Sequence, residues 1–159
     1  MTKKRILKIS LLVVAVALII GGSVAYYMFN MPHRDIQATK TDYSLKSSDI
    51  VNEYLSNADL ANEKYLDSEG ESKIIEISGN VFDVSDDFNS NKVVMLKSEG
   101  DNAGVSCTFY KETNPNASKL IKGDKVTIKG VIRSGASFDN DLGMYEDVIM
   151  EKCDVVSNK

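Results

Sequence analysis

One uncharged stretch near the N-terminus constrains this chain more than any other feature. Residues 9–32 carry no charged side chain, and the 21 residues of Ile9–Phe29 are mostly aliphatic. A helix of that length, at about 1.5 Å per residue, spans roughly 30 Å, the thickness of a hydrocarbon core. No polar stripe interrupts the stretch, as one would in a helix packed on a soluble core. The sequence therefore predicts a transmembrane helix.

Residues at the two ends of this span predict its orientation. Basic residues stand at positions 3, 4, 5 and 8 with no acid among them, and the aromatic residues Tyr26, Tyr27 and Phe29 close the far end. Basic flanks stay in the cytoplasm, and aromatic rings favour the membrane–water interface. We therefore expect a single-pass protein of the cytoplasmic membrane. Its N-terminus would be cytoplasmic and its remaining domain would lie on the extracytoplasmic (periplasmic) side.

A cleaved signal peptide is the alternative interpretation of the same stretch. The apolar run Ile9–Ile20 has the length of a signal-peptide core, and Ser23–Ala25 offers small residues suited to cleavage after Ala25. The hydrophobic character continues to Phe29, which favours a retained anchor. Both interpretations place the rest of the chain outside the cytoplasm.

The chain divides by pattern into three parts. Residues 1–31 form the basic tip and the anchor, residues 32–46 are expected to be a juxtamembrane tether, and residues 47–159 are expected to fold. An amphipathic helix is predicted at 47–66, capped by Ser47 or Ser48, because apolar residues recur every three or four positions. These residues are Ile50, Val51, Tyr54, Leu55, Ala58, Ala61 and Tyr65.

Strands are predicted after the amphipathic helix. Alternating apolar residues indicate five of them, at 73–84, 92–97, 105–110, 125–133 and 147–156, with a short helical turn within 113–122 and a long polar loop at 134–146. Two strands, at Ile77–Val81 and Ile128–Ile132, share an apolar-x-Gly-x-apolar pattern, and glycine suits the bends of a closed sheet. The pattern predicts a mainly β fold, a five-stranded OB-fold Greek-key barrel.

Short motifs in a fixed order support this fold. They are Leu120–Gly130, Tyr27–Asn30, Pro32–Asp35, Lys64–Leu66, Ile75–Gly79, Gly104–Cys107, and Asp147-Val148 with Cys153. In these motifs, residues 26–156 resemble the bacterial tRNA_anti-like family of membrane-attached OB-fold envelope proteins. The resemblance implies the fold and the membrane attachment. It implies no activity or ligand, since none is established for the family.

No residue pattern predicts an enzyme, a metal site or a cofactor. His33 is the single histidine, so neither a zinc site nor a hydrolytic triad is expected. The glycines have no phosphate-binding spacing. No carboxylate lies in an apolar run that would raise its pKa for acid catalysis.

Two groups of residues are candidates for ligand binding. An OB face that binds single strands needs stacking aromatics and basic side chains, and here Lys92, Lys97, Tyr110 and Lys111 would form such a ligand face. The second group is a loop cluster of Asp86, Asp87, Asp139 and Asp141. These carboxylates could bind a hard cation, although Asp is equally typical of ordinary turns.

Charge counts against nucleic acid as the ligand. The region after the span holds 15 basic and 23 acidic residues, a net charge of −8, which repels phosphates. The predicted function is a non-catalytic, membrane-anchored extracytoplasmic binding module for an envelope protein, peptide or glycan. A domain that binds single-stranded nucleic acid is the alternative. The sequence identifies no small-molecule partner.

The two cysteines are candidates for a disulfide. Cys107 would share a face with Val105 and Phe109 on the third strand, and Cys153 would lie on the fifth strand with Ile149 and Val155. An OB barrel places these two strands side by side, so the sulfurs could meet. Free, buried thiols are the alternative, because cysteine is among the most often buried residues.

Overall fold

The structure is a computed structural model that describes residues 3–30, 34–66 and 72–156, and it divides into two compact units, residues 1–34 and 35–159. The first unit contains one helix, α1 (Lys3–Phe29). Its segment Leu12–Phe29 is the one stretch within the described ranges that is long and apolar enough to cross a membrane, judged by length and composition. The expected N-terminal apolar helix is therefore confirmed.

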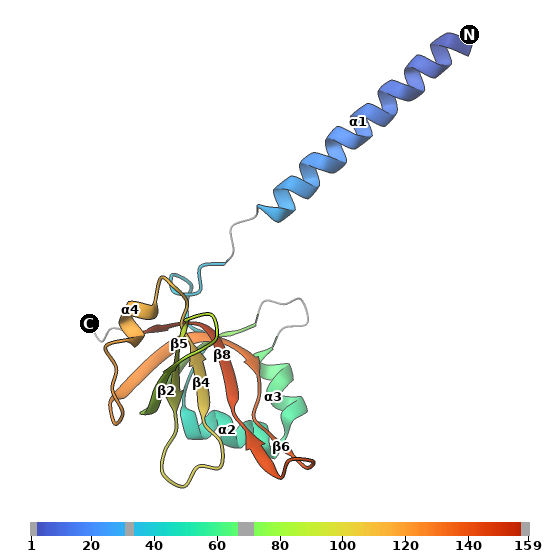
Figure 1. Cartoon of the computed structure of the whole chain (residues 1–159). Helices are drawn as coiled ribbons and strands as arrows, with labels where there is room; N and C mark the ends of the chain where they lie inside the picture. Colours follow the sequence, from blue (N-terminus) through green and yellow to red (C-terminus); the bar gives the residue numbers. More distant parts are fainter. Residues whose placement is uncertain (1–2, 31–33, 67–71, 157–159) are drawn as a thin grey trace. The chain divides into compact units, whose positions relative to one another are not determined.

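The second unit is a closed β-barrel with added helices (Figure 1). Its elements, in chain order, are β1 (Tyr43–Lys46), α2 (Ser47–Ser56), α3 (Ala58–Tyr65), β2 (Ile74–Asp86), β3 (Lys92–Leu96), β4 (Val105–Thr108), α4 (Asn114–Ala117), β5 (Lys125–Ser134), β6 (Ser137–Asp139), β7 (Met144–Glu146) and β8 (Val148–Val155). The strands pair in the order β1-β2-β3-β4-β8-β5, and β5 also pairs with β2 to close the barrel. Five strands thus form the closed ring, which confirms the mainly β OB-fold prediction.

Close approach at two glycines explains the bends of the barrel. A Cβ on Gly79 would lie 2.8 Å from the Ser47 hydroxyl, and a Cβ on Gly130 would lie 2.9 Å from the Cys153 sulfur. Around Gly79 the long strand β2 passes from pairing with β5, where Ile77 faces Ile128, to pairing with β3. The glycine pattern in the sequence therefore marks positions where only a residue without a side chain fits.

The predicted helix at 47–66 is wrong as a single element, because it consists of two helices. Asn57 interrupts it in an extended conformation, with φ −160° and ψ 95°, and its side-chain oxygen accepts the Leu60 N–H at 3.1 Å to cap α3. The predicted serine cap is also wrong. Lys46 is the N-cap residue of α2 and makes no side-chain cap bond, whereas the Ser48 hydroxyl donates to Asp101 at 3.0 Å.

Both helices contribute to the barrel core. Tyr54 of α2 and Tyr65 of α3 are buried, with ring centroids 6.1 Å apart. In Figure 1, α2 lies at the lower end of the barrel with α3 and β6 to its right. The helix pair thus closes one end of the barrel. Most of the predicted apolar stripe faces the core, whereas Ala58, next to the break at Asn57, is exposed.

The described residues of the segment expected to be a tether, 34–46, contact the barrel. Its end forms β1, which pairs in parallel with β2, with Tyr43 opposite Ile75. Upstream, the Gln37 side chain donates to the Lys152 carbonyl at 2.9 Å, and Lys129 donates to the Thr39 carbonyl at 2.6 Å. Tyr43 and Leu45 occupy alternate positions of β1 and pack against the core, while backbone pairing holds the strand on β2.

The expected polar loop at 134–146 contains a β-hairpin. Strands β6 and β7 pair with Phe138 opposite Tyr145 and Asp139 opposite Met144. Gly143 takes a positive φ of 65° at the turn, where a residue without a Cβ is favoured. The hairpin carries two aromatic rings away from the barrel wall, and these rings line the groove described below.

Candidate functional site

Two of the three lysines proposed for the ligand face, Lys92 and Lys97, lie far apart. Lys92 begins β3 and Lys97 directly follows its end, so they stand roughly 16 Å apart at about 3.3 Å per residue. They are an odd number of positions apart, so strand alternation directs them to opposite faces. Both ammonium groups have partners, since Lys92 pairs with Asp86 at 2.8 Å and Lys97 donates to the Asn102 carbonyl at 3.2 Å.

Tyr110 and Lys111 lie at the Lys92 end of the barrel wall. The N–H of Phe109, which precedes them, donates to the Lys92 carbonyl at 2.8 Å. Burial raises the pKa of the Tyr110 phenol, and the charge of Glu151 raises the pKa further. Tyr110 therefore lies near the Glu151 carboxylate, and the four proposed residues do not form a continuous basic strip.

The outward row across β2, β3, β4 and β8 is mixed rather than basic. Its residues pair in register as Asp83 with Met95, Met95 with Ser106, and Ser106 with Ile149. This row contains one acid, two apolar side chains and no base. A single nucleic-acid strand would find neither a cationic track nor a stacking ring along this row.

Two of the four acidic loop residues, Asp87 and Asp139, serve as turn acceptors. Asp87 accepts the N–H groups of Asn89 and Asn91, each at 2.8 Å, and Asp139 accepts the N–H of Asp141 at 2.8 Å. The described residues contain no group of three or more His, Cys, Asp or Glu side chains able to hold a metal ion. His33 lies outside the described residues. The geometry therefore supports ordinary turn chemistry for the proposed loop cluster.

The two cysteines meet inside the barrel. Cys107 lies opposite Met150 in the β4–β8 pairing, and both cysteines are fully buried. The predicted face of Cys153 is wrong, because Ile149 points outward while Met150 and Cys153 point inward. A bulge with a positive φ of 54° at Lys152 shifts the alternation of β8 by one residue.

The Cys107 thiol neighbours the Cys153 thiol and donates to the Val105 carbonyl at 3.8 Å. Burial raises the pKa of the Cys153 thiol, and a hydrogen bond with Cys107 raises it further, so it stays protonated at neutral pH. Both cysteines are free in this structure. The disulfide between Cys107 and Cys153 stays a prediction, now with both side chains in one place.

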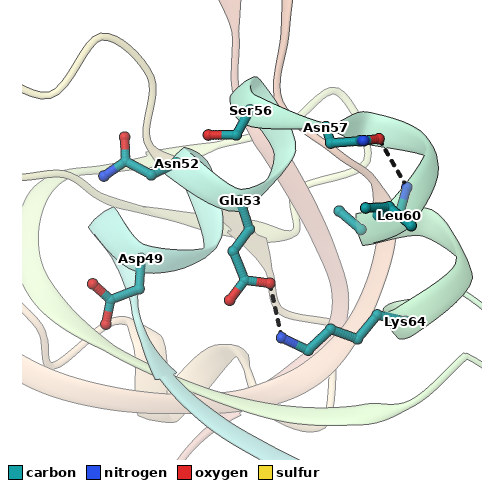
Figure 2. Close-up of a pocket in the computed structure, with 8 residues that line it drawn as sticks. Asp49, Asn52, Glu53, Ser56, Asn57, Leu60 and Lys64 are labelled. Carbon is teal, nitrogen blue, oxygen red and sulfur yellow. Dashed lines mark hydrogen bonds and ion pairs between the residues drawn. The ribbon is translucent and has the colours of Figure 1, made fainter.

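A first cavity of about 490 Å³ lies between α2 and α3 (Figure 2). Glu53 stands at its centre and accepts hydrogen bonds from the Lys64 ammonium at 2.8 Å and the Tyr65 hydroxyl at 2.7 Å. Lys64 also lies over the Tyr65 ring, 4.8 Å from its centroid. These contacts join the two helices.

Protonation states in this cavity do not suit acid–base catalysis. Burial alone would raise the pKa of Glu53, but the hydrogen bonds from Lys64 and Tyr65 outweigh it and lower that pKa. The hydrogen bond to Glu53 raises the pKa of Lys64. A general acid or base works best with a pKa near neutrality, whereas both groups here stay charged.

A second cavity, a groove of about 620 Å³, separates the β6–β7 hairpin from the α2–α3 junction. Phe138 and Tyr145 line it from the hairpin, and their ring centroids lie 4.8 Å apart. Both are solvent-exposed, by 46% and 40%. The sequence did not predict this groove. Its signal would have been the two aromatic residues on either side of the turn-forming Asp139–Gly143, a pattern typical of a β-hairpin.

Tyr54 lines the same groove and has an unusual hydroxyl. Its ring packs on Gly135, where a Cβ would lie 2.0 Å from ring carbons. Within the described part of the chain, the buried hydroxyl has no hydrogen-bond partner. Burial raises the pKa of Tyr54 to about 12, so this donor keeps its proton at neutral pH.

Together, the barrel and its helices define an OB-fold domain. The tRNA_anti-like family model matches residues 1–142, and the chain belongs to that family. No curated protein matches the chain. This family match confirms the resemblance that the sequence motifs indicated.

Solved structures share the fold at low sequence identity. A "putative nucleic acid-binding lipoprotein" from Klebsiella pneumoniae is similar with a TM-score of 0.52 and 15% identity, over 71% of this chain and 91% of that one. Asparaginyl-tRNA synthetase from Pyrococcus horikoshii matches with a TM-score of 0.36 and 18% identity, over 55% of this chain and 20% of that enzyme. At 15% identity, the likeness to the Klebsiella structure concerns the fold alone.

Proposed function

We propose that this chain is a membrane-anchored, extracytoplasmic OB-fold module that binds a protein, peptide or glycan of the cell envelope and catalyses no reaction. The observation that carries the proposal is the pairing of an apolar helix of membrane-spanning length with an OB barrel. Basic residues precede that helix, which supports an N-terminus in the cytoplasm. If the apolar helix were instead a cleaved leader, the same domain would be released on the extracytoplasmic side of the membrane.

The chemistry of the described cavities supports binding without catalysis. Glu53 and Lys64 neutralise each other, and the Cys153 thiol is buried and protonated. An activated nucleophile needs an adjacent base that lowers its pKa, and neither cavity offers that arrangement among the described residues.

Binding of single-stranded nucleic acid is the second candidate. The printed description of the Klebsiella lipoprotein favours it. Against it stand the net charge of −8 after the span and the row of Asp83, Met95, Ser106 and Ile149, which carries no base. Phosphate neutralisation supplies most non-specific affinity for nucleic acids, and this surface lacks the cations for it.

Crosslinking in intact cells tests the proposed function. A membrane-impermeant amine crosslinker should join the domain to envelope material through exposed lysines such as Lys46 and Lys152. Adducts that form only with a membrane-permeant reagent would contradict it.

A titration with labelled oligothymidylate tests the second candidate. At physiological salt it should give no binding tighter than non-specific levels of about 10⁻⁴ to 10⁻⁶ M. Salt-sensitive binding well below a micromolar would instead establish the nucleic-acid candidate.

A further inference from the structure

We propose that the groove between the β6–β7 hairpin and the α2–α3 junction binds an uncharged glycan chain. The inference rests on the proposed function, since it names the ligand class of an extracytoplasmic binding module. It also moves the binding site away from the strand face predicted by Lys92, Lys97, Tyr110 and Lys111.

The lining of the groove is polar but carries no charge. Its described lining residues include no Asp, Glu, Lys, Arg or His. This is unusual on a domain whose acidic residues outnumber its basic ones by 23 to 15. Because the lining offers no charge to pair with an ionic group or a phosphate, the groove suits an uncharged ligand.

The hairpin supplies an aromatic platform. Phe138 and Tyr145 face each other across β6 and β7, at an interplanar angle of 59°. Both rings remain substantially exposed, although large apolar side chains gain free energy from burial. The C–H face of a sugar ring is an apolar surface of matching size, so one pyranose can cover a ring without needing a charged partner.

The opposite wall supplies hydrogen-bonding groups for sugar hydroxyls. Asn52 and Asn102 line the groove, and their side-chain amides make no hydrogen bond with another described residue. An amide both donates and accepts, which suits hydroxyl groups that do the same.

Nucleic acid fits this groove less well. A single nucleic-acid strand needs basic side chains beside its stacking rings, and none lines the groove within the described residues.

Calorimetry on the full chain tests this site. The protein is placed in lipid nanodiscs, because the sugar headgroups of alkyl maltoside detergents would compete for the groove. The probes are cellotetraose, tetra-N-acetylchitotetraose, the anionic tetragalacturonate and a decamer of oligothymidylate. We expect at least one neutral tetrasaccharide to bind with a dissociation constant below about 1 mM, and the two anionic probes not to bind.

Variants assign that binding to the groove. Tyr145→Ala should weaken it about tenfold, whereas Tyr145→Phe, which keeps the ring, should stay within about threefold. Asn102→Ala on the opposite wall should weaken binding about fivefold. Leu142→Ala is the matched control, because Leu142 is 71% exposed on the same hairpin but does not line the groove.

Three outcomes would overturn the inference. They are no binding of either neutral tetrasaccharide, tighter binding of an anionic probe, or neutral binding that survives both Tyr145→Ala and Asn102→Ala. Because the impermeant crosslinker reports on the proposed function separately, a domain that reacts outside the membrane but ignores both neutral sugars refutes the glycan site alone.

Discussion

Replacing Tyr54 by phenylalanine should stabilise the domain. The Tyr54 hydroxyl is buried and lacks a partner among the described residues, so folding strips it of water without a compensating bond. A buried, unsatisfied polar group costs about 1–3 kcal/mol. Phenylalanine keeps the ring on Gly135 and beside Tyr65, where the centroids lie 6.1 Å apart. The free energy of unfolding should therefore rise by about 1–3 kcal/mol.

The assay is urea unfolding of residues 35–159, followed by circular dichroism because the chain has no tryptophan. The midpoint should rise with an unchanged slope, and 1 kcal/mol should raise the melting temperature by about 4 °C. Tyr65→Phe is the matched control, for which the free energy of unfolding should change in the opposite direction. Its hydroxyl donates to the Glu53 carboxylate at 2.7 Å, so its loss should destabilise by about 1.5–3 kcal/mol. A Tyr54→Phe variant less stable than the parent would refute the reasoning.

Three further predictions follow from the same packing. Gly135→Ala should destabilise the domain by about 1–3 kcal/mol in the same urea assay, because its Cβ would lie 2.0 Å from the Tyr54 ring; parental stability would contradict this contact. Folding lowers the pKa of Glu53, so its hydrogen bonds stabilise the domain at pH values above the unfolded pKa, and this stabilisation is lost as the pH falls through the folded pKa. The free energy of unfolding should therefore fall less steeply at acid pH in Glu53→Gln than in the parent. An unchanged acid dependence would contradict the role of Glu53. Mass spectrometry of the protein alkylated in denaturant without prior reduction, where buried thiols become accessible, should show no alkyl groups on Cys107 and Cys153, since their disulfide would add about 4 kcal/mol; two added groups would mean free thiols.

Strand alternation made the barrel predictable. The five ring strands follow from apolar alternation, and the two glycine bends follow from the repeated pattern around Gly79 and Gly130. Pairing of the third and fifth predicted strands is also confirmed, with Cys107 opposite Met150. These features depend on side-chain periodicity, which a sequence displays directly.

Features set by backbone geometry were not predictable in the same way. β1 is a four-residue strand in a polar segment, and its alternation consists of Tyr43 and Leu45 alone. The bulge at Lys152 reverses the face of Cys153, and no glycine marks its position. The break at Asn57 is clearer in hindsight, since asparagine is a favoured N-cap residue. The groove depends on Phe138 and Tyr145 meeting α2, a long-range contact that no local pattern reports.

Topology in intact cells tests the central claim most directly. The chain carries one epitope tag before Lys3 and another after Lys159, and protease is added to spheroplasts with sealed membranes. The account predicts loss of the C-terminal tag and the barrel, with the N-terminal tag protected and still joined to α1. A mature chain that begins at Tyr26 would replace the anchor with a cleaved leader. A barrel protected from the protease until the membrane is opened would contradict an extracytoplasmic binding module.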